Sequence, residues 1–399
     1  MIRALFVTFA WGSHFYPMVP FATALRSGGH EVLVASDPGF TGTITNAGLP
    51  AVPVGADIGI KTRASGAFAG FNPRNRDESE ASAAVRQRAE SYSQLATDSA
   101  TAMAEDIYRL AEGWSPDVIV YEPTAIIAPG LAAHRGVPAL RMLWGVDYLA
   151  SVMRRRKEVL TELAREQSVD LDQAFGDVTV DPCPARLQID WELRRQPIRY
   201  IPYNGPASLP HHLRTPPARP RILVTWGGSL RDLGLNDGIL GPGIVRALAR
   251  QSQYDIVIAT TEDQRPLYGH VPDNVIHIGP IAIHLVLPTC DAVIHQGGAG
   301  TTMTAMSAGV PQLVFPWVAD GLINADRISQ AGAGRGVPAA DLDTSTLDHH
   351  VSSFLDNLAE HRGAAARLRD EHQAHPTPTQ LVTEFQRQHE DRTGLWALT

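Results

Sequence analysis

Short apolar runs alternate along the whole chain with longer segments of helical spacing, which predicts parallel β-sheets joined by crossover helices. Each apolar run is short enough for a buried strand, and polar or glycine-rich residues bound most of them. The predicted strands are residues 4–9, 31–35, 51–54, 118–121 and 139–143 in the first half, and 222–226, 256–259, 275–278, 292–295 and 312–315 in the second. The pattern therefore indicates an α/β fold.

The segments between these strands predict helices and one loop. A helix begins at Pro17, where proline is tolerated in the first turn, and stops at the Gly28-Gly29 pair. Residues 77–112 are polar and alanine-rich, and predict either a helix pair or one broken helix. Residues 58–76 lack clean periodicity, so we expect a mobile loop there. A charged helix is expected over residues 376–389.

A proline-dense stretch at residues 206–220 separates the two sets of strands. Prolines stiffen a segment and deny it regular structure, so this stretch is expected to be an interdomain linker that permits hinge motion. The predicted parts are an N-terminal domain over residues 1–205, a C-terminal domain over 221–375 and a C-terminal helix within 376–399. A chain of 399 residues with 44% hydrophobic content suits two domains of about 200 residues each.

Composition excludes several classes of protein. A net charge of −8 and a pI near 6.0 argue against nucleic-acid binding, which requires an excess of Lys and Arg. Cys183 and Cys290 are the only cysteines, which supports neither a disulfide framework nor a four-cysteine zinc site. The first apolar run is followed by Trp11 and Gly12 instead of a cleavage site, and no run approaches the roughly 20 residues that span a bilayer. We expect no membrane insertion and a cytoplasmic protein.

The segment from Asp291 to Trp317 contains the strongest signal for chemistry, because it predicts a strand, a glycine-rich turn, a helix and another strand. The glycines at positions 297, 298 and 300 allow backbone N–H groups to approach an anion at the start of the helix, where the helix dipole is positive. His295 and Thr301 or Thr302 add side-chain donors. A diphosphate could be held there without the lysine of a P-loop, a motif that this chain lacks. On its own, the same pattern is equally consistent with a tight turn.

The residues around this turn extend the pattern. His295-Gln-Gly-Gly-Ala-Gly-Thr301 is followed by Ala308-Gly-Val-Pro-Gln312, Phe315-Pro316, Asp320 and Asn324-Ala325. This series resembles the nucleotide-sugar signature of the GT-B glycosyltransferases. More narrowly, it resembles bacterial enzymes that attach dTDP-activated deoxysugars to polyketide, macrolide or enediyne antibiotics. The resemblance implies two Rossmann-like parallel-sheet domains that face each other across a cleft, with the last helix crossing back to the first domain.

The candidate catalytic residues follow strands of the first domain, where parallel sheets bind ligands. His14 lies in Gly12-Ser-His-Phe-Tyr-Pro17, which resembles the family's Gly-His-x-x-Pro turn with one extra residue between glycine and histidine. In the family this histidine is the base toward the acceptor hydroxyl, a role that suits imidazole near neutral pH. Glu122 is the expected carboxylate partner and Asp147 a second candidate. Without the resemblance, His14 would be a structural histidine and Glu122 a cap or surface carboxylate.

The resemblance also implies a donor site in the second domain, in which Asp320 accepts hydrogen bonds from sugar hydroxyls. The expected donor-binding residues are Gly228, Ser229, His295, Gly297, Gly298, Gly300, Thr301 and Asp320. Two departures from the family pattern matter. Gly321 stands where many relatives have glutamine, which suggests an opening suited to a deoxysugar. Pro280 and Ala282 replace a Trp and a Pro, which leaves the choice between dTDP and UDP open.

Aromatic and apolar residues near strand ends of the first domain suggest a broad acceptor pocket, although each could instead pack in the core. The expected acceptor-binding residues are Trp11, Phe15, Phe68, Phe71, Trp144 and Asp147. As a group they suit a hydrophobic polycyclic or macrolide aglycone.

The resulting hypothesis is an inverting hexosyltransferase that needs no cofactor and no metal, since no Asp-x-Asp motif is placed to hold a divalent ion. Its partners are a nucleoside-diphosphate sugar and a hydrophobic small-molecule aglycone, and a homodimer is left open. The alternatives are a nucleotide-sugar epimerase of the same fold, which would need no apolar acceptor pocket, and a non-catalytic sugar-nucleotide-binding auxiliary protein.

Overall fold

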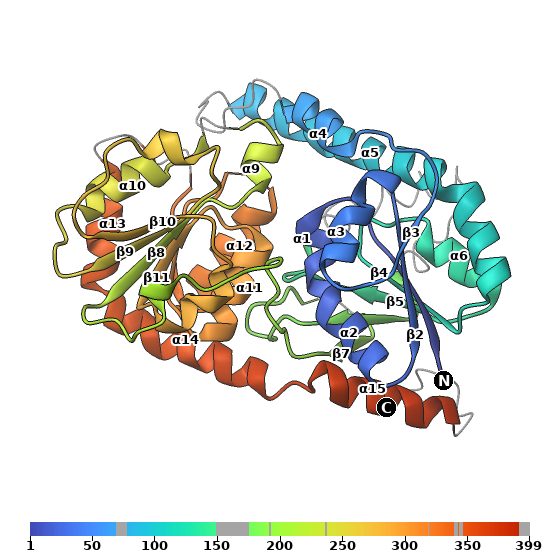
Figure 1. Cartoon of the computed structure of the whole chain (residues 1–399). Helices are drawn as coiled ribbons and strands as arrows, with labels where there is room; N and C mark the ends of the chain where they lie inside the picture. The colour runs from blue at the N-terminus through green and yellow to red at the C-terminus, as the bar shows by residue number, and fades with distance from the viewer. Residues whose placement is uncertain are drawn as a thin grey trace. The chain divides into compact units, whose positions relative to one another are not determined.

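The computed structural model describes residues 1–68, 78–148, 175–190, 193–235, 238–317, 319–338, 342 and 346–390. These residues form two compact units (Figure 1). The first unit comprises Met1–Ile60, Tyr92–Tyr203 and the chain from Ala374 onward, and the second comprises Lys61–Ser91 and Asn204–Gln373. Residues 61–68, expected in the N-terminal domain, thus group with the second unit. The domain bounds drawn from the sequence stay a prediction.

The first unit contains a parallel sheet in which seven described strands pair in the order β3-β2-β1-β4-β5-β6-β7. The strands are β1 (Arg3–Val7), β2 (Glu31–Ser36), β3 (Ala51–Pro53), β4 (Val118–Tyr121), β5 (Ala139–Met142), β6 (Val178–Asp181) and β7 (Arg195–Pro197). The order runs outward in opposite directions from β1 and β4. The point between these two strands is where a doubly wound sheet opens a crevice at its carboxyl edge.

Most helices of the first unit lie between strands, as the sequence pattern predicted, and two segments of the chain differ from the prediction. They are α1 (Gly12–Phe15), α2 (Val19–Ser27), α3 (Thr41–Asn46), α6 (Ala128–Arg135) and α15 (Pro378–Glu390), with 3-10 turns η1 (Tyr16–Met18) and η2 (Pro38–Phe40). Helix α5 runs unbroken over Glu78–Trp114, so the expected pair or broken helix was wrong. Ile60–Phe68 forms helix α4, nearly all of which belongs to the second unit, so this part of the expected loop is helical; residues 69–76 lie outside the described residues.

The second unit has a parallel sheet in the order β10-β9-β8-β11-β12-β13. Its strands are β8 (Arg221–Thr225), β9 (Asp255–Ala259), β10 (Val275–Gly279), β11 (Ala292–His295), β12 (Gln312–Val314) and β13 (Gly334–Gly336). Its further helices are α9 (Ser229–Asp232), α10 (Gly241–Leu248), α11 (Ala299–Ala308), α12 (Ala319–Gln330), α13 (Thr346–Asp356) and α14 (Leu358–Gln373). Its 3-10 turns are η4 (His211–Leu213), η6 (Arg265–Tyr268), η7 (Ile283–Leu285) and η8 (Leu287–Thr289). Here the topological switch falls between β8 and β11.

Both sheets are held by apolar layers that the strand pattern anticipates. In the first unit, Leu5 and Val7 of β1 and Ile119 of β4 pack with Met103 and Ile107 of α5. In the second, the central strands pack against α11 and the 3-10 turns before β11. Burial of these side chains fixes which face of each strand points inward, and leaves the carboxyl ends of the central strands to carry polar residues.

Helix α15 packs on α2 within the first unit (Figure 1). Phe385 of α15 meets Phe21 of α2 edge to face at 5.7 Å between ring centroids, and both side chains are buried. The backbone N–H of Arg199 also bonds the carbonyl oxygen of Pro376. Helix α15 is therefore part of the same compact unit as helix α2 and strand β1.

Candidate functional site

His14 and Glu122 meet at the switch point of the first sheet. His14 lies in the short helix after β1, and Glu122 directly follows β4, the neighbouring strand. Nδ1 of the imidazole lies 3.3 Å from Oε2 of Glu122 and 3.0 Å from Oγ1 of Thr124. The structure thus brings together the two side chains that the sequence predicted to pair. The catalytic roles of the two residues stay a prediction.

The Glu122 carboxylate is fully buried and surrounded by donors. It accepts hydrogen bonds from the backbone N–H groups of Phe9 and Thr124, each at 2.9 Å, and from the Thr124 hydroxyl. Burial alone would raise the pKa of this carboxyl, but the charge of His14 and the hydrogen bonds from His14 and Thr124 lower it below its usual value. Glu122 is therefore a buried carboxylate that stays ionised.

Thr124 bridges the pair and assigns the tautomer of the imidazole. Its hydroxyl has one proton, which it donates to Glu122 at 2.7–2.8 Å. Its oxygen is then an acceptor for Nδ1–H of His14, so Nε2 carries no proton and can act as an acceptor. The Tyr92 hydroxyl of α5 lies 3.4 Å from that Nε2. Thr124 could have been suspected from its position two residues after Glu122, whereas no sequence signal pointed to Tyr92.

Trp144 is the expected acceptor residue that the structure places directly at His14. Its ring stacks on the imidazole with centroids 4.2 Å apart and planes 15° apart. Trp11 is 8% exposed, and Phe15 is buried and packs edge to face on Phe40. Phe15 is thus a core residue, which corrects its expected contact with an acceptor.

Two further acceptor candidates lie elsewhere. Phe68 belongs to α4 and groups with the second unit. Phe71 lies outside the described residues. The structure places neither residue beside His14, so their acceptor roles stay predictions.

Asp147 is held in a buried ion pair with Arg141, whereas the carboxylate that contacts His14 is that of Glu122; the expected contact of Asp147 with an acceptor stays a prediction. Its carboxylate is 2.5 Å from Nη2 of Arg141 and 3.6 Å from Nη2 of Arg195, and the Asp147 side chain is 1% exposed. Nε of Arg141 in turn donates to the hydroxyl of Thr179. A carboxylate that neutralises a fully buried guanidinium is held in place, because separating the pair would leave a buried charge uncompensated.

In the second unit, two glycine turns lie side by side at the switch point. Thr225 at the end of β8 pairs in register with His295 at the end of β11. The chain then turns through Gly227, whose φ is +60°, and Gly228 precedes the first turn of α9, in which Ser229 is half-buried. Backbone N–H groups from both turns therefore collect at one edge of the sheet.

His295 does not point its nitrogens into this edge. Nε2 donates to Oε1 of Gln312 at 2.9 Å, and Nδ1 accepts the backbone N–H of Gly297 at 3.0 Å. The ring is fully buried, and burial lowers its pKa to about 4, so the imidazole is neutral. Both ring nitrogens are thus used inside the protein. In this arrangement His295 shapes the turn, and its expected donation to a diphosphate stays a prediction.

The turn itself has the form of an anion site. Gly297 has a φ of +87°, and a Cβ there would lie 2.9 Å from Cα of Gly321, so only glycine fits. Gly298 is the N-cap of α11, and Gly300 has open space around it. The first amides of this ten-residue helix, up to Thr301, have no partner within the helix. They present the positive end of its dipole.

Gln296 is a further residue of this turn that was not among the expected donor-binding residues. It is 6% exposed, and among the described side chains its Oε1 is one of the buried polar atoms without a hydrogen-bond partner. A Cβ at Gly227 or at Gly298 would lie 3.0 Å from its Nε2. The amide therefore lies between the two glycine turns. The Gly-Gly-Ala-Gly pattern indicates an anion-binding turn through its glycines, and it carries no signal for the polar side chain that precedes them.

Helix α12 closes the other side of the turn. Nδ2 of Asn324 donates to the carbonyl oxygen of Gly297 at 2.7 Å. Asp320 is half-buried in the first turn of α12. A Cβ at Gly321 would lie 3.0 Å from the carbonyl oxygen of Gln296, so this position is packed against backbone and is not the opening expected from the sequence.

No group of three or more His, Cys, Asp or Glu residues in the described part of the chain is arranged to hold a metal ion.

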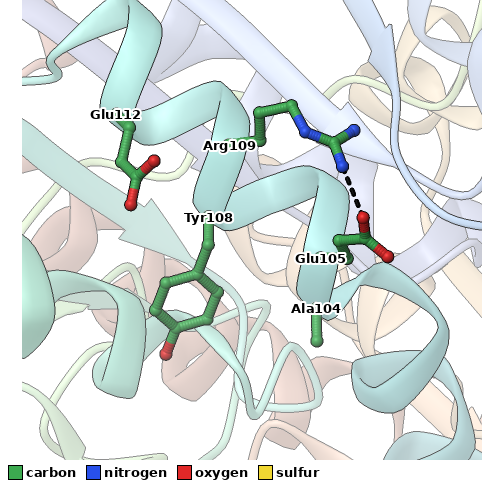
Figure 2. A pocket seen from close by; sticks show the side chains of 5 residues that line it. All are labelled: Ala104, Glu105, Tyr108, Arg109 and Glu112. Atoms are coloured by element: carbon green, nitrogen blue, oxygen red, sulfur yellow. Dashed lines mark hydrogen bonds and ion pairs between the residues drawn. The ribbon is translucent and has the colours of Figure 1, made fainter.

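A shallow hollow of about 440 Å³ lies along α5 beside Ala104, Tyr108 and Glu112, with Arg109 bonded to Glu105 at its rim (Figure 2). None of its lining residues belongs to either glycine turn or to the His14 pair. Within the same described ranges, no helix is long and apolar enough to cross a membrane.

Comparisons with known proteins agree over nearly the whole chain. Residues 23–227 match the family model described as the N-terminal domain of erythromycin biosynthesis protein CIII-like proteins, and residues 245–387 match the corresponding C-terminal domain. The chain is 34% identical to a 10-deoxymethynolide desosaminyltransferase of Streptomyces venezuelae, over 97% of each chain. It is 33% identical to an aklavinone 7-beta-L-rhodosaminyltransferase of Streptomyces galilaeus, over 97% of this chain and 95% of the relative.

Solved structures give the same result. The crystal structure of the glycosyltransferase VinC in complex with dTDP superposes with a TM-score of 0.79 at 31% identity, covering 98% of this chain and all of that one at 100%. Spinosyn rhamnosyltransferase SpnG complexed with thymidine diphosphate has a TM-score of 0.77 at 29% identity, with 96% of this chain and 100% of that chain covered. Two doubly wound parallel-sheet units of this kind define the class of glycosyltransferases with the GT-B fold. Within that class, the chain belongs to the erythromycin biosynthesis protein CIII-like family.

Proposed function

We propose that this protein is an inverting, metal-independent glycosyltransferase that moves a deoxysugar from a dTDP-linked donor to a hydrophobic polyketide aglycone. The observation that carries the proposal is the His14–Thr124–Glu122 arrangement, in which the buried carboxylate and the hydroxyl fix the imidazole with Nε2 as a base. A purely structural histidine would not need an ionised glutamate buried behind it, since burying a charge is costly.

In the proposed step, the acceptor hydroxyl transfers its proton to Nε2 of His14 as its oxygen forms a bond to the anomeric carbon. The bond from that carbon to the diphosphate oxygen breaks, and dTDP leaves with the electron pair. The imidazolium that forms is stabilised by Glu122 through Thr124 and through the direct contact at 3.3 Å. Attack opposite to the leaving group inverts the anomeric configuration.

The second unit holds the donor in this proposal. The backbone N–H groups at the start of α11 and in the turn at Gly228 receive the diphosphate, and the amide of Gln296 lies between them. These donors are preorganised, so they stabilise the charge that develops on the leaving group without reorganisation. No step requires a metal ion. Asp320 is assigned to sugar hydroxyls.

The nature of the two substrates is supported by the relatives. Their printed names include desosaminyl, rhodosaminyl and mycaminosyl transferases, and their acceptors include 10-deoxymethynolide, aklavinone and tylactone. Two of the solved neighbours are complexes with dTDP or thymidine diphosphate. These sugars are deoxysugars and these acceptors are largely apolar, in line with the aromatic residues around His14.

The proposal is tested by incubating the full chain with dTDP-deoxysugars and UDP-hexoses and a panel of macrolactone and anthracyclinone aglycones, with mass spectrometry of the products. We expect a glycoside with inverted anomeric configuration, formed equally well in the presence of EDTA. An epimerised donor without glycoside would indicate an epimerase. Binding of dTDP without any product, with every aglycone, would indicate an auxiliary protein.

His14→Ala is the matching control. It should leave dTDP affinity within twofold and lower turnover about a hundredfold or more, the usual contribution of a positioned general base. Turnover that persists within a few-fold would show that another group is the base.

A further inference from the structure

The loop after β5 carries the residue that covers the face of the imidazole. Trp144 stacks on His14 with ring centroids 4.2 Å apart and an interplanar angle of 15°. Other aromatic rings near the imidazole meet it at larger distances, with Phe9 at 6.0 Å and tilted by 33°. The nearly parallel Trp144 contact is therefore the one that defines the plane of the His14 ring.

The loop that bears Trp144 is tied down on both sides of it. Before Trp144, the backbone N–H of Leu143 bonds the carbonyl oxygen of Val180 in β6. After it, the backbone N–H of Asp147 donates to Oε1 of Gln188 at 2.8 Å, and the carboxylate of Asp147 is paired with Arg141. Nε2 of Gln188 also reaches the carbonyl oxygen of Gly145. A buried network of this kind holds the backbone of the loop in one place.

The imidazole needs such a support. Its Nδ1 is held by Thr124 and Glu122 and its Nε2 lies 3.4 Å from the Tyr92 hydroxyl, but contacts at the two nitrogens alone still allow the plane of the ring to tilt. A tilt changes the direction of the lone pair on Nε2, and proton transfer requires that this direction match the acceptor hydroxyl. A flat ring packed against one face of the imidazole removes that freedom. It also presents its negative π face to the ring that becomes an imidazolium.

We propose that Trp144 is a positioning residue for His14, which holds the plane of the imidazole and stabilises its protonated form, and that the buried Arg141–Asp147 pair serves to hold Trp144 in place. This inference rests on the proposed role of His14 as the base. It gives Trp144 a role exerted through His14, different from the direct contact with an aglycone that its aromatic character suggested. Glu122, Thr124 and Tyr92 are the other polar groups that face the imidazole.

Trp144→Leu tests the proposal, because leucine keeps the site apolar and removes the flat π face. We expect kcat to fall about tenfold while the KM for the aglycone changes by less than about threefold. The acidic limb of the pH profile of kcat should move to lower pH, because a contact that favours the protonated ring is lost. Trp144→Phe keeps an aromatic face and should remain within about threefold of the wild type.

A readout independent of activity separates this proposal from the proposed function. In the unliganded full chain with ¹³C-labelled histidine, the His14 ring resonance, identified by its loss in His14→Gln, should be shifted by the ring current of Trp144. The shift should vanish in Trp144→Leu and its pH titration should move in the same direction as the kinetic profile. This result tests the coupling even if His14→Ala were to retain turnover.

Trp114→Leu is the matched control, a tryptophan of the same unit at the end of α5 that packs beside the core cluster of the sheet. It should leave the His14 resonance and its titration unchanged. Thermal unfolding and dTDP affinity report whether each variant is folded. A Trp144→Leu variant with unchanged kcat and raised KM would overturn the proposal and make Trp144 an aglycone contact. So would an unchanged His14 titration in a folded Trp144→Leu protein.

Discussion

Gly297 and Gly321 approach each other backbone to backbone, so closely that a Cβ on Gly297 would lie 2.9 Å from Cα of Gly321. Gly297 belongs to the turn after β11 and Gly321 to the first turn of α12. The bond from Asn324 to the carbonyl oxygen of Gly297 ties the same two segments together. The turn at Gly297, called the donor turn after its proposed role, is therefore shaped by helix α12 as much as by its own glycines.

Gly297→Ala should disrupt the donor turn, because it adds both a close contact and the cost of a positive φ. We expect a loss of stability of about 1–3 kcal/mol and at least a tenfold weaker affinity for dTDP, measured by thermal unfolding and calorimetry. Gly363→Ala is the control, since this glycine of helix α14 lies outside the turn and its Cβ would meet only Nη1 of Arg367, at 3.5 Å. It should keep dTDP binding. Equal loss in the two variants would contradict the assignment.

Thr124→Val should uncouple His14 from Glu122, because it removes the hydroxyl that accepts from Nδ1 and donates to the carboxylate. We expect kcat to fall by about ten- to a hundredfold with little change in dTDP affinity. Thr124→Ser keeps the hydroxyl and should restore most of the activity. If serine and valine were equivalent, the hydroxyl would have no part in orienting the base.

His295 makes stability depend on pH in a defined window. Its folded pKa is lowered to about 4 from 6.5, so below pH 6.5 the unfolded chain binds a proton that the folded chain does not. Stability from this residue is complete above pH 6.5 and falls as the pH drops toward 4, by up to roughly 3 kcal/mol.

His295→Gln tests this dependence, because a glutamine amide can donate to Gln312 and accept from Gly297 as the imidazole does. Urea unfolding at several pH values should show a shallower loss of stability in this variant between pH 6.5 and 4.5. An unchanged slope would mean that other groups, such as the ionised Glu122, dominate in that window.

Asp320→Asn should lower kcat/KM for every sugar donor while leaving dTDP affinity nearly unchanged, because a carboxylate that accepts from hydroxyls is replaced by an amide. The expected loss is about tenfold or more.

The wild type should prefer a dTDP-deoxyhexose to a UDP-hexose with the same acceptor. Gly321→Gln is a poor test of that preference, since its Cβ would press on the Gln296 carbonyl. A wild type that strongly favours UDP-glucose would refute the predicted donor.

Much of the fold could be predicted from the sequence. Ten expected strands are present, because buried parallel strands leave uninterrupted apolar runs. The short strands β6, β7 and β13 were missed, since polar residues such as Thr179 and Arg195 interrupt any run and only pairing with a neighbour makes them strands. The continuity of α5 was likewise not visible in its polar composition.

For the site, the sequence by itself determined that His14, Glu122 and the glycine turn lie at carboxyl ends of strands, because strand order along the chain and the position of loops follow from local pattern. Only the tertiary structure decided where side chains point. His295 turns inward to Gln312, Asp147 pairs with Arg141, Phe15 packs in the core, and Trp144 covers His14. Each of these outcomes depends on a partner beyond the residue's immediate neighbours in the chain, whose hydrogen bonds and packing outweigh any preference that the residue carries alone.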